Sequence, residues 1–218
     1  MLIFFNILFL MLMWSYWTAS LSDPGSVPQF YGYDYEGAKG IVKRRYCLTC
    51  QCFKPDRCHH CSACNRCVLN MDHHCLWLNN CVGFWNRKAF MLVLIYAESI
   101  TLLIEVTMLN DFVKAIEWGC SDEFFSKYDD KFHKNMLVIV SYVLNSIILA
   151  LMTTFLRFHW MLATQNKTTI ENLENDGFFF YSKYDIGVKE NLAQIFGDSP
   201  ALYALPIVGH LRGDGLSF

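Results

Sequence analysis

Three long apolar runs divide the chain, and each has the length of a membrane-spanning helix. They cover residues 2–21, 89–109 and 136–156. A helix of about 20 apolar residues crosses the hydrocarbon core of a bilayer. The first and third runs carry no charged residue, whereas the second contains Glu98 and Glu105. The pattern predicts an α-helical integral membrane protein with three transmembrane helices.

The polar segments between these runs predict the orientation of the chain. Residues 22–88 carry nine Lys and Arg residues, and residues 110–135 carry four Lys residues against six acidic ones. Basic loops stay on the cytosolic side, so we expect segment 22–88 and the tail in the cytosol and segment 110–135 in the lumen. The competing interpretation of residues 1–20 is a signal peptide, although the run lacks a basic start and is longer than usual.

The composition agrees with a membrane protein that carries one local metal-binding module. The chain is 54% hydrophobic and only 17% charged, whereas a soluble domain is roughly 25% charged. A net charge of −2 gives no reason to expect a nucleic-acid partner. Nine of the ten cysteines lie between Cys47 and Cys81. In a reducing cytosol such a cluster favours zinc over disulfides.

The cysteines and histidines of this cluster repeat with an offset of fourteen residues. The pattern C-x2-C-x9-H-x6-C occurs twice, interleaved. Three thiolates and one imidazole form a closed tetrahedral set that is typical of structural zinc. We therefore predict two structural Zn2+ ions, with the ligand sets Cys47, Cys50, His60, Cys67 and Cys61, Cys64, His74, Cys81. Spacing alone leaves open a different partition, for example one that pairs Cys58 with Cys61.

A third repeat begins at Cys75 and is not completed, because Leu78 and Lys88 stand where a cysteine and a histidine would be needed. Cys75 therefore has no metal to bind, and it follows Asp72 and His73. A neighbouring imidazole and a nearby dication lower the pKa of a thiol and create a thiolate nucleophile. We predict Cys75 as the nucleophile, His73 as its base and Asp72 as the residue that orients His73. The alternative is that Cys75 is a spare buried thiol.

The run DHHC at residues 72–75, followed by LWLNNCVGFWNRKAF, resembles the DHHC family of protein S-acyltransferases, the integral-membrane palmitoyltransferases. Shorter matches flank it in the order that the family shows. They are DPG at 23–25, TTIE at 168–171 and ENLAQIFG at 190–197. The supporting residues that the resemblance implies are Asp23, Thr168, Thr169, Glu171 and Asn191.

The resemblance implies that Cys75 accepts a palmitoyl group from palmitoyl-CoA and passes it to a substrate cysteine, in a ping-pong reaction. It implies that His73 and Asp72 complete the active site, and that the two zinc ions use the eight ligands selected by the offset. The implied partners are the lipid bilayer, long-chain acyl-CoA and membrane-associated proteins with cytosolic cysteines. The implied location is the Golgi, another endomembrane or the plasma membrane, with the active site facing the cytosol.

Three features depart from the family pattern. The usual member has four spans, whereas this chain shows three and lacks the first, so a second hypothesis is a truncated, catalytically impaired isoform that acts as a membrane zinc-binding scaffold. Leu76 stands where the family usually has proline, and we expect it to alter the rate. Glu98 and Glu105 share one helix face. We expect both carboxylates to line the acyl cavity, for which Ile100 is a comparable candidate. The alternative is that the helix is shifted along the membrane normal, so that Glu105 lies near the lumenal surface.

The predicted domain organisation follows the chain in seven segments. They are a transmembrane helix at 1–21, a juxtamembrane linker with the DPG turn at 22–46, the zinc domain at 47–88, a transmembrane helix at 89–109, a lumenal loop at 110–135, a transmembrane helix at 136–158 and a cytosolic tail at 159–218. The zinc domain lacks helical periodicity, so we expect short hairpins there. Thr168 and Glu171 have the spacing of a capping box. Cys52, Cys58 and Cys120 lie outside both ligand sets.

Overall fold

The structure is a computed structural model, and it describes residues 1–32, 45–120, 130–174, 181–207 and 211–217. Residues 33–44 of the predicted linker and residues 121–129 of the predicted lumenal loop lie outside the described residues. The chain divides into two compact units. One contains Met1–Leu12 and Leu94–Arg157, and the other contains Met13–Val93 and Phe158–Phe218.

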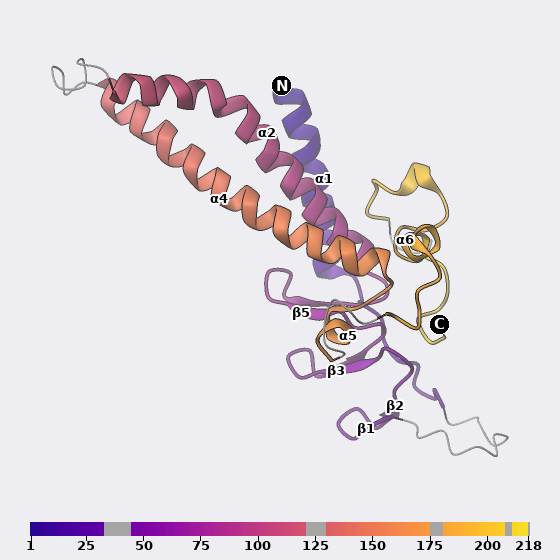
Figure 1. Ribbon diagram of the computed structural model, residues 1–218. Coiled ribbons are helices and arrows are strands. Elements are labelled where there is room, and N and C mark those ends of the chain that lie inside the picture. The colour runs from indigo at the N-terminus through magenta and orange to yellow at the C-terminus, as the bar shows by residue number, and fades with distance from the viewer. Residues whose placement is uncertain (33–44, 121–129, 175–180, 208–210, 218) are drawn as a thin grey trace. The chain divides into compact units, whose positions relative to one another are not determined.

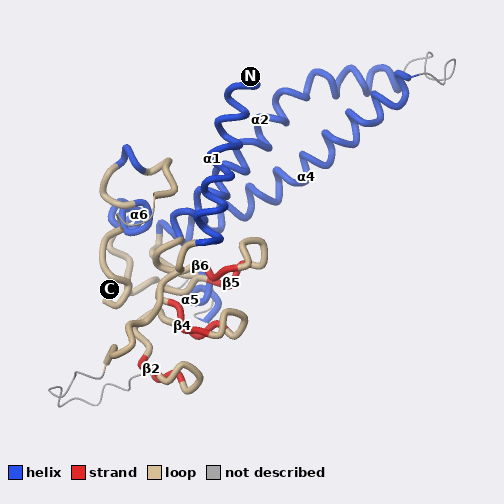
Figure 2. The backbone as a smooth tube through the Cα atoms, turned by 180° about the vertical axis from the view of Figure 1, so that it is seen from behind, coloured by secondary structure: helices blue, strands red, loops and turns tan. Residues whose placement is uncertain are grey.

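Three long helices confirm the predicted fold class. They are α1 (Leu2–Leu21), α2 (Arg87–Gly119) and α4 (Asp130–Thr164), drawn in blue in Figure 2. Each is long and apolar enough to cross a membrane. Helices α2 and α4 continue beyond the apolar runs from which they were predicted, because polar residues end an apolar run without ending a helix.

Polar side chains pair α2 with α4 in the first unit. The Glu105 carboxylate accepts hydrogen bonds from Asn145 Nδ2 at 2.7 Å and from Ser146 Oγ at 2.6 Å. Glu98 Oε1 accepts one from Thr153 Oγ1 at 3.0 Å. Such bonds between helices help to hold a helix pair together in a bilayer. Both carboxylates therefore connect α2 to α4. The expectation that they line a cavity for the acyl chain stays a prediction.

The cysteine-rich region forms three antiparallel hairpins, which confirms the expectation of short hairpins (Figure 1). The pairs are β1 (Tyr46–Cys47) with β2 (Cys52–Phe53), β3 (His59–Cys61) with β4 (Arg66–Val68), and β5 (His73–Cys75) with β6 (Asn80–Val82). Gln51, Asn65 and Asn79 lie fourteen residues apart, and their φ angles are 52°, 50° and 49°. Asparagine tolerates this left-handed conformation better than most residues. The backbone conformation of the hairpin turns therefore repeats every fourteen residues, as the cysteine and histidine ligands do.

Two asparagines tie the third hairpin to the end of α1. Asn80 Nδ2 lies 2.9–3.2 Å from the carbonyl oxygens of Ala19, Ser20 and Ser22. Asn86 Nδ2 donates to the Ala19 carbonyl at 3.1 Å. The last carbonyls of a helix have no partner within the helix. Asn80 and Asn86 supply these partners, so the cap of α1 also positions the hairpin that carries Cys75.

A short helix, α5 (Thr169–Glu174), follows α4 and begins with the predicted capping box. The backbone N–H of Thr168 donates to Glu171 Oε2 at 2.9 Å, and the backbone N–H of Glu171 donates to Thr168 Oγ1 at 3.2 Å. Glu171 also forms two bonds with the buried Arg57 guanidinium, at 2.7 and 2.8 Å. Arg57 donates to Asn166 as well, at 2.8 and 2.9 Å. One buried cation thus joins the hairpin region to the segment after α4.

The tail ends in α6 (Val188–Phe196) and the short 3-10 helix η2 (Pro200–Leu202). Asn191 is buried in α6. Its Nδ2 donates to the Thr164 carbonyl at 2.8 Å and to Asp185 Oδ1 at 2.6 Å, and its Oδ1 accepts from the N–H of Ile186 at 3.1 Å. Asn191 therefore supplies a hydrogen-bond donor to a carbonyl in the last turn of α4 and holds α6 against that turn.

Two arginines give a matched test of this packing. We expect Arg57→Met to lower the free energy of unfolding by about 3 kcal/mol, because it leaves the Glu171 carboxylate nearly buried without its cation. Arg66→Met removes an ion pair with Asp23 whose side chains are 37% and 56% exposed, so the expected change is below about 1 kcal/mol. The measurement is thermal unfolding of the detergent-solubilised protein, and equal shifts for the two variants would contradict the prediction.

Candidate active site and metal centres

The first group of metal-ligating side chains comes from the first two hairpins. It contains Cys47, Cys50, His60 and Cys67, whose ligand atoms all lie within 4.8 Å of one another. His60 Nδ1 lies 3.2 Å from Cys50 Sγ and 3.7 Å from Cys47 Sγ. The backbone N–H of Cys50 points at Cys47 Sγ, at 3.4 Å. The imidazole nitrogen and the sulfurs thus surround one point.

The second group repeats this geometry one hairpin further along. It contains Cys61, Cys64, His74 and Cys81. His74 Nδ1 lies 3.6, 3.4 and 3.7 Å from the sulfurs of Cys61, Cys64 and Cys81. Cys64 Sγ and Cys81 Sγ are 3.5 Å apart, close to the roughly 3.8 Å that tetrahedral bonds of about 2.3 Å produce. Both groups could hold a metal ion, and they are the two sets that the fourteen-residue offset selects.

Cys75 has the place of a first ligand in the third hairpin. It pairs with Asn80 as Cys61 pairs with Arg66 in the second hairpin. Leu78 stands in the turn where the second hairpin has Cys64. Among the described residues, Cys75 belongs to neither Cys3His group. The thiol is buried, with 7% of the residue exposed.

His73 connects the Cys75 thiol to the carboxylate of Asp72. His73 Nδ1 lies 2.7 Å from Asp72 Oδ2. Burial disfavours the charged form of His73, but the hydrogen bonds with Asp72 and Cys75 outweigh burial and raise the pKa of His73 to about 9. Burial likewise acts to raise the pKa of Cys75, but its hydrogen bond with His73 and the N–H of Leu78 hold that pKa below its ordinary value. Both shifts favour an imidazolium–thiolate pair.

Asp72 is almost completely buried, with 1% of the residue exposed. Thr169 donates to it twice, through its backbone N–H at 3.0 Å and its hydroxyl at 2.8 Å. The Arg87 guanidinium lies 3.6 Å from Asp72 Oδ1. Burial acts to raise the pKa of Asp72, but the His73 hydrogen bond and the Arg87 charge hold it far below its usual range. Asp72 is therefore an anionic acceptor that orients the imidazole.

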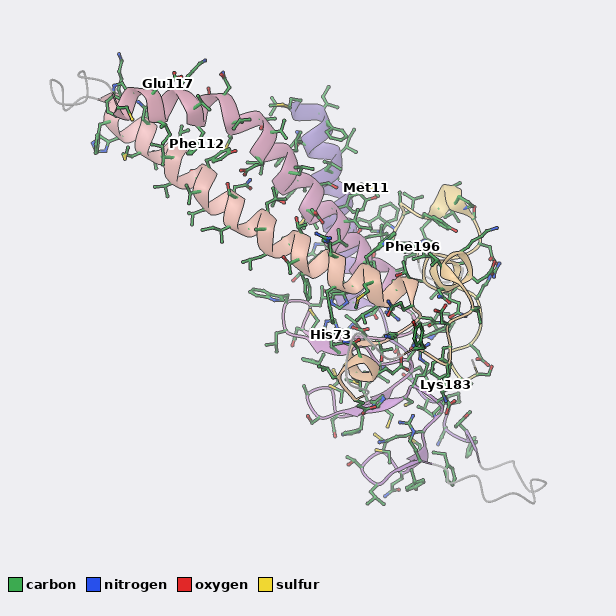
Figure 3. All side chains as sticks on the ribbon, in the orientation of Figure 1. Met11, His73, Phe112, Glu117, Lys183 and Phe196 are labelled. Atoms are coloured by element: carbon green, nitrogen blue, oxygen red, sulfur yellow. The ribbon has the colours of Figure 1, made fainter. Side chains whose placement is uncertain are left out.

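Arg87 and His159 belong to this site, and the sequence reasoning did not find them. His159 lies near the end of α4, with Nδ1 3.9 Å from Asp72 Oδ2 and its ring 5.6 Å from that of His73. It is buried and packs edge-on against Phe90. Figure 3 shows His73 where the β5 hairpin meets the helix ends. His159 directly follows the helix predicted at 136–158, so the sequence analysis placed it in the tail, where no motif marked it.

The supporting residues have different contacts. Thr169 touches Asp72 directly, whereas Thr168 and Glu171 cap the helix that presents Thr169. Asp23 Oδ1 accepts from the N–H of Gly25 at 2.7 Å, and Asp23 pairs with Arg66. Asn191 holds α6 to the end of α4. Of the five supporting residues, Thr169 is therefore the one that these bonds connect to the Asp72–His73 pair.

Metal content separates ligands from neighbouring thiols. We expect the purified protein to hold about two zinc ions per chain, because each Cys3His group offers one complete tetrahedral set. Cys64→Ser removes a ligand of the second group, so the variant loses at least one ion. Cys52→Ser changes a half-buried thiol that packs beside the first group without belonging to it, and this control keeps both ions. Elemental analysis after gel filtration measures the content, and full zinc occupancy in Cys64→Ser would refute the assignment.

The chain is similar to known palmitoyltransferases. Residues 41–176 match the family model for DHHC palmitoyltransferases. The chain is 37% identical to the probable protein S-acyltransferase 12 of Arabidopsis thaliana over 217 residues, 93% of this chain and 71% of that protein. It is 35% identical to the palmitoyltransferase ZDHHC20 of Homo sapiens over 248 residues, which cover 100% of this chain and 65% of that protein. The chain belongs to the DHHC palmitoyltransferase family.

Proposed function

We propose that this chain is a protein S-palmitoyltransferase that works through a thioester on Cys75. The acyl group comes from a long-chain acyl-CoA such as palmitoyl-CoA, and it goes to cysteine thiols of membrane-associated proteins. The observation that carries the proposal is the buried Cys75 thiol, which is hydrogen-bonded to His73 and lies outside both Cys3His groups. Family membership and three membrane-spanning helices support the same reaction.

The first half-reaction loads the enzyme. The Cys75 thiolate attacks the thioester carbonyl of acyl-CoA, and a carbon–sulfur bond to Cys75 forms as the bond to the coenzyme A sulfur breaks. The His73 imidazolium supplies the proton that the departing coenzyme A thiolate takes up. Asp72 keeps the ring in the orientation that this transfer needs. One thioester replaces another, so the step needs no further source of energy.

The second half-reaction transfers the acyl group. A substrate thiol gives its proton to His73 and attacks the thioester on Cys75, which regenerates the thiolate. This order of events gives ping-pong kinetics. A long acyl chain gains about 0.8 kcal/mol for each CH2 that leaves water, so a protein with membrane-spanning helices suits this substrate. The basic segment between the first two helices supports a cytosolic site, in the Golgi, another endomembrane or the plasma membrane.

The two metal groups serve structure in this proposal. Three cysteines and one histidine complete a tetrahedral zinc site and leave no open position for a substrate. The metal ions would fix the hairpins, and the chemistry would belong to Asp72, His73 and Cys75. The competing hypothesis, a zinc-binding scaffold with an inert site, requires an unreactive Cys75. The hydrogen bonds that lower the pKa of this thiol favour the enzyme instead.

Acyl loading tests the proposal directly. The chain is expressed as it stands in membranes and is incubated with a clickable palmitoyl-CoA. We expect a label that hydroxylamine removes, because hydroxylamine cleaves thioesters. Cys75→Ser loses the label, and Cys120→Ser, which changes an exposed cysteine outside both metal groups, keeps it. A protein that holds both zinc ions and takes up no label would refute the proposal and favour the scaffold.

Thr169 tests the role of the buried carboxylate. We expect Thr169→Val to slow the loading of Cys75 about ten-fold or more, because a hydrogen bond to a charged group contributes about 1.5–3 kcal/mol. Thr169→Ser keeps the hydroxyl that reaches Asp72 and restores most of the rate. The measurement is the single-turnover rate of thioester formation, with zinc content as a check on the fold. Equal rates for the valine and serine variants would exclude this role.

A further inference from the structure

The tip of the third hairpin presents two large apolar side chains to its surroundings. Leu76 is 84% exposed and Trp77 is 87% exposed. They follow Cys75 directly, in the turn between β5 and β6. Single exposed apolar residues are ordinary on a soluble protein, but adjacent ones form a patch that favours a partner or a lipid surface.

Hydrogen bonds link this tip to a helix that can cross the membrane. The Tyr16 hydroxyl donates to the carbonyl oxygen of Trp77 at 3.2 Å. On the other side of the turn, Asn80 binds the carbonyls at the end of α1. The tip therefore lies at the depth of the last turns of α1, beside Tyr16.

The same turns of α1 carry the residues that mark a membrane interface. Trp14 and Trp17 flank Tyr16 in sequence, and 46% and 56% of their surfaces are exposed. Tryptophan and tyrosine gather at the level of the lipid headgroups, where one part of the ring is in apolar surroundings and the other is hydrated. Trp77 adds a further exposed aromatic side chain at this level, from outside the helix.

We propose that Leu76 and Trp77 insert into the interfacial region of the bilayer and anchor the third hairpin to lipid. Leucine and tryptophan are the side chains with which peripheral elements enter the boundary between headgroups and acyl chains. Because Cys75 is the preceding residue, the anchor fixes the depth at which its thiol lies. The lipid contact does not depend on acyl transfer, so it can be tested separately from the proposed function.

The first hairpin provides an internal control. Leu48 occupies the position that Leu76 occupies two repeats later, and it is equally exposed, at 85%. Thr49 in turn corresponds to Trp77. In both Figure 1 and Figure 2 the β1–β2 hairpin is the farthest of the three from the end of α1, and the β5–β6 hairpin is the nearest. The same side chain thus lies at two different depths on one repeated scaffold.

The test is photo-crosslinking in liposomes of phosphatidylcholine. p-Benzoylphenylalanine replaces Leu76 in one full-length variant and Leu48 in another, the samples are irradiated without acyl-CoA, and adducts are identified by mass spectrometry. We expect the yield of phospholipid adduct at residue 76 to exceed that at residue 48 several-fold. Equal yields of phospholipid adduct at the two positions would overturn the proposal. The proposal would also be overturned if residue 76 crosslinked only to protein and not to phospholipid.

A second pair of variants guards against a local folding defect. The same photoreactive residue replaces Trp77 or Thr49, and zinc content verifies that the hairpins are intact. We expect the phospholipid adduct again to favour the third hairpin, at residue 77. Equal yields at residues 77 and 49, like equal yields in the first pair, would refute the lipid anchor and leave the loading of Cys75 as an independent result. A chain that crosslinks to lipid and takes up no palmitoyl label would refute only the proposed function.

Discussion

The arrangement of the site depends on the buried carboxylate of Asp72. An anion without contact to water is strongly destabilising unless donors and cations surround it. These come from separate elements: His73 from β5, Thr169 from the start of α5, and the guanidinium of Arg87 from the start of α2. The need to satisfy one carboxylate therefore brings three elements together, and the imidazole it holds is the one that contacts Cys75.

The repeat explains why a thiol that belongs to neither Cys3His group can exist within a metal-binding region. Each Cys3His group takes its first two cysteines from one hairpin and its remaining ligands from the next hairpin. A chain of three hairpins can therefore complete two groups, and the third hairpin is left with a first cysteine and no further ligands. Cys75 is this remainder, placed by the same backbone geometry as Cys61. The metal ions would thus make the position of the proposed nucleophile rigid without coordinating it.

The parts of the site that were predictable from sequence are those governed by local spacing. The fourteen-residue offset selects the two groups that the structure brings together, and the spacing of Thr168 and Glu171 predicts the capping box. Arg57, Arg87 and His159 were not found, because their partners lie far away in sequence and the contacts exist only after the segments dock. The ends of α2 and α4 were missed for a different reason, since hydropathy reports lipid contact and not helix length.

The end of α1 shows how membrane and site constraints are met by the same residues. A helix that leaves the bilayer must satisfy its last carbonyls, and unsatisfied backbone groups are costly near lipid. Water or a glycine cap would serve this need without any link to the site. Here Asn80 and Asn86 serve it from the third hairpin and the turn that follows it. Asn80 pairs with Cys75 across the hairpin, so the groups that cap the helix also hold the strand opposite Cys75. The position of the thiol is therefore coupled to the end of α1 by hydrogen bonds from asparagine side chains to backbone carbonyls, independently of the metal ions.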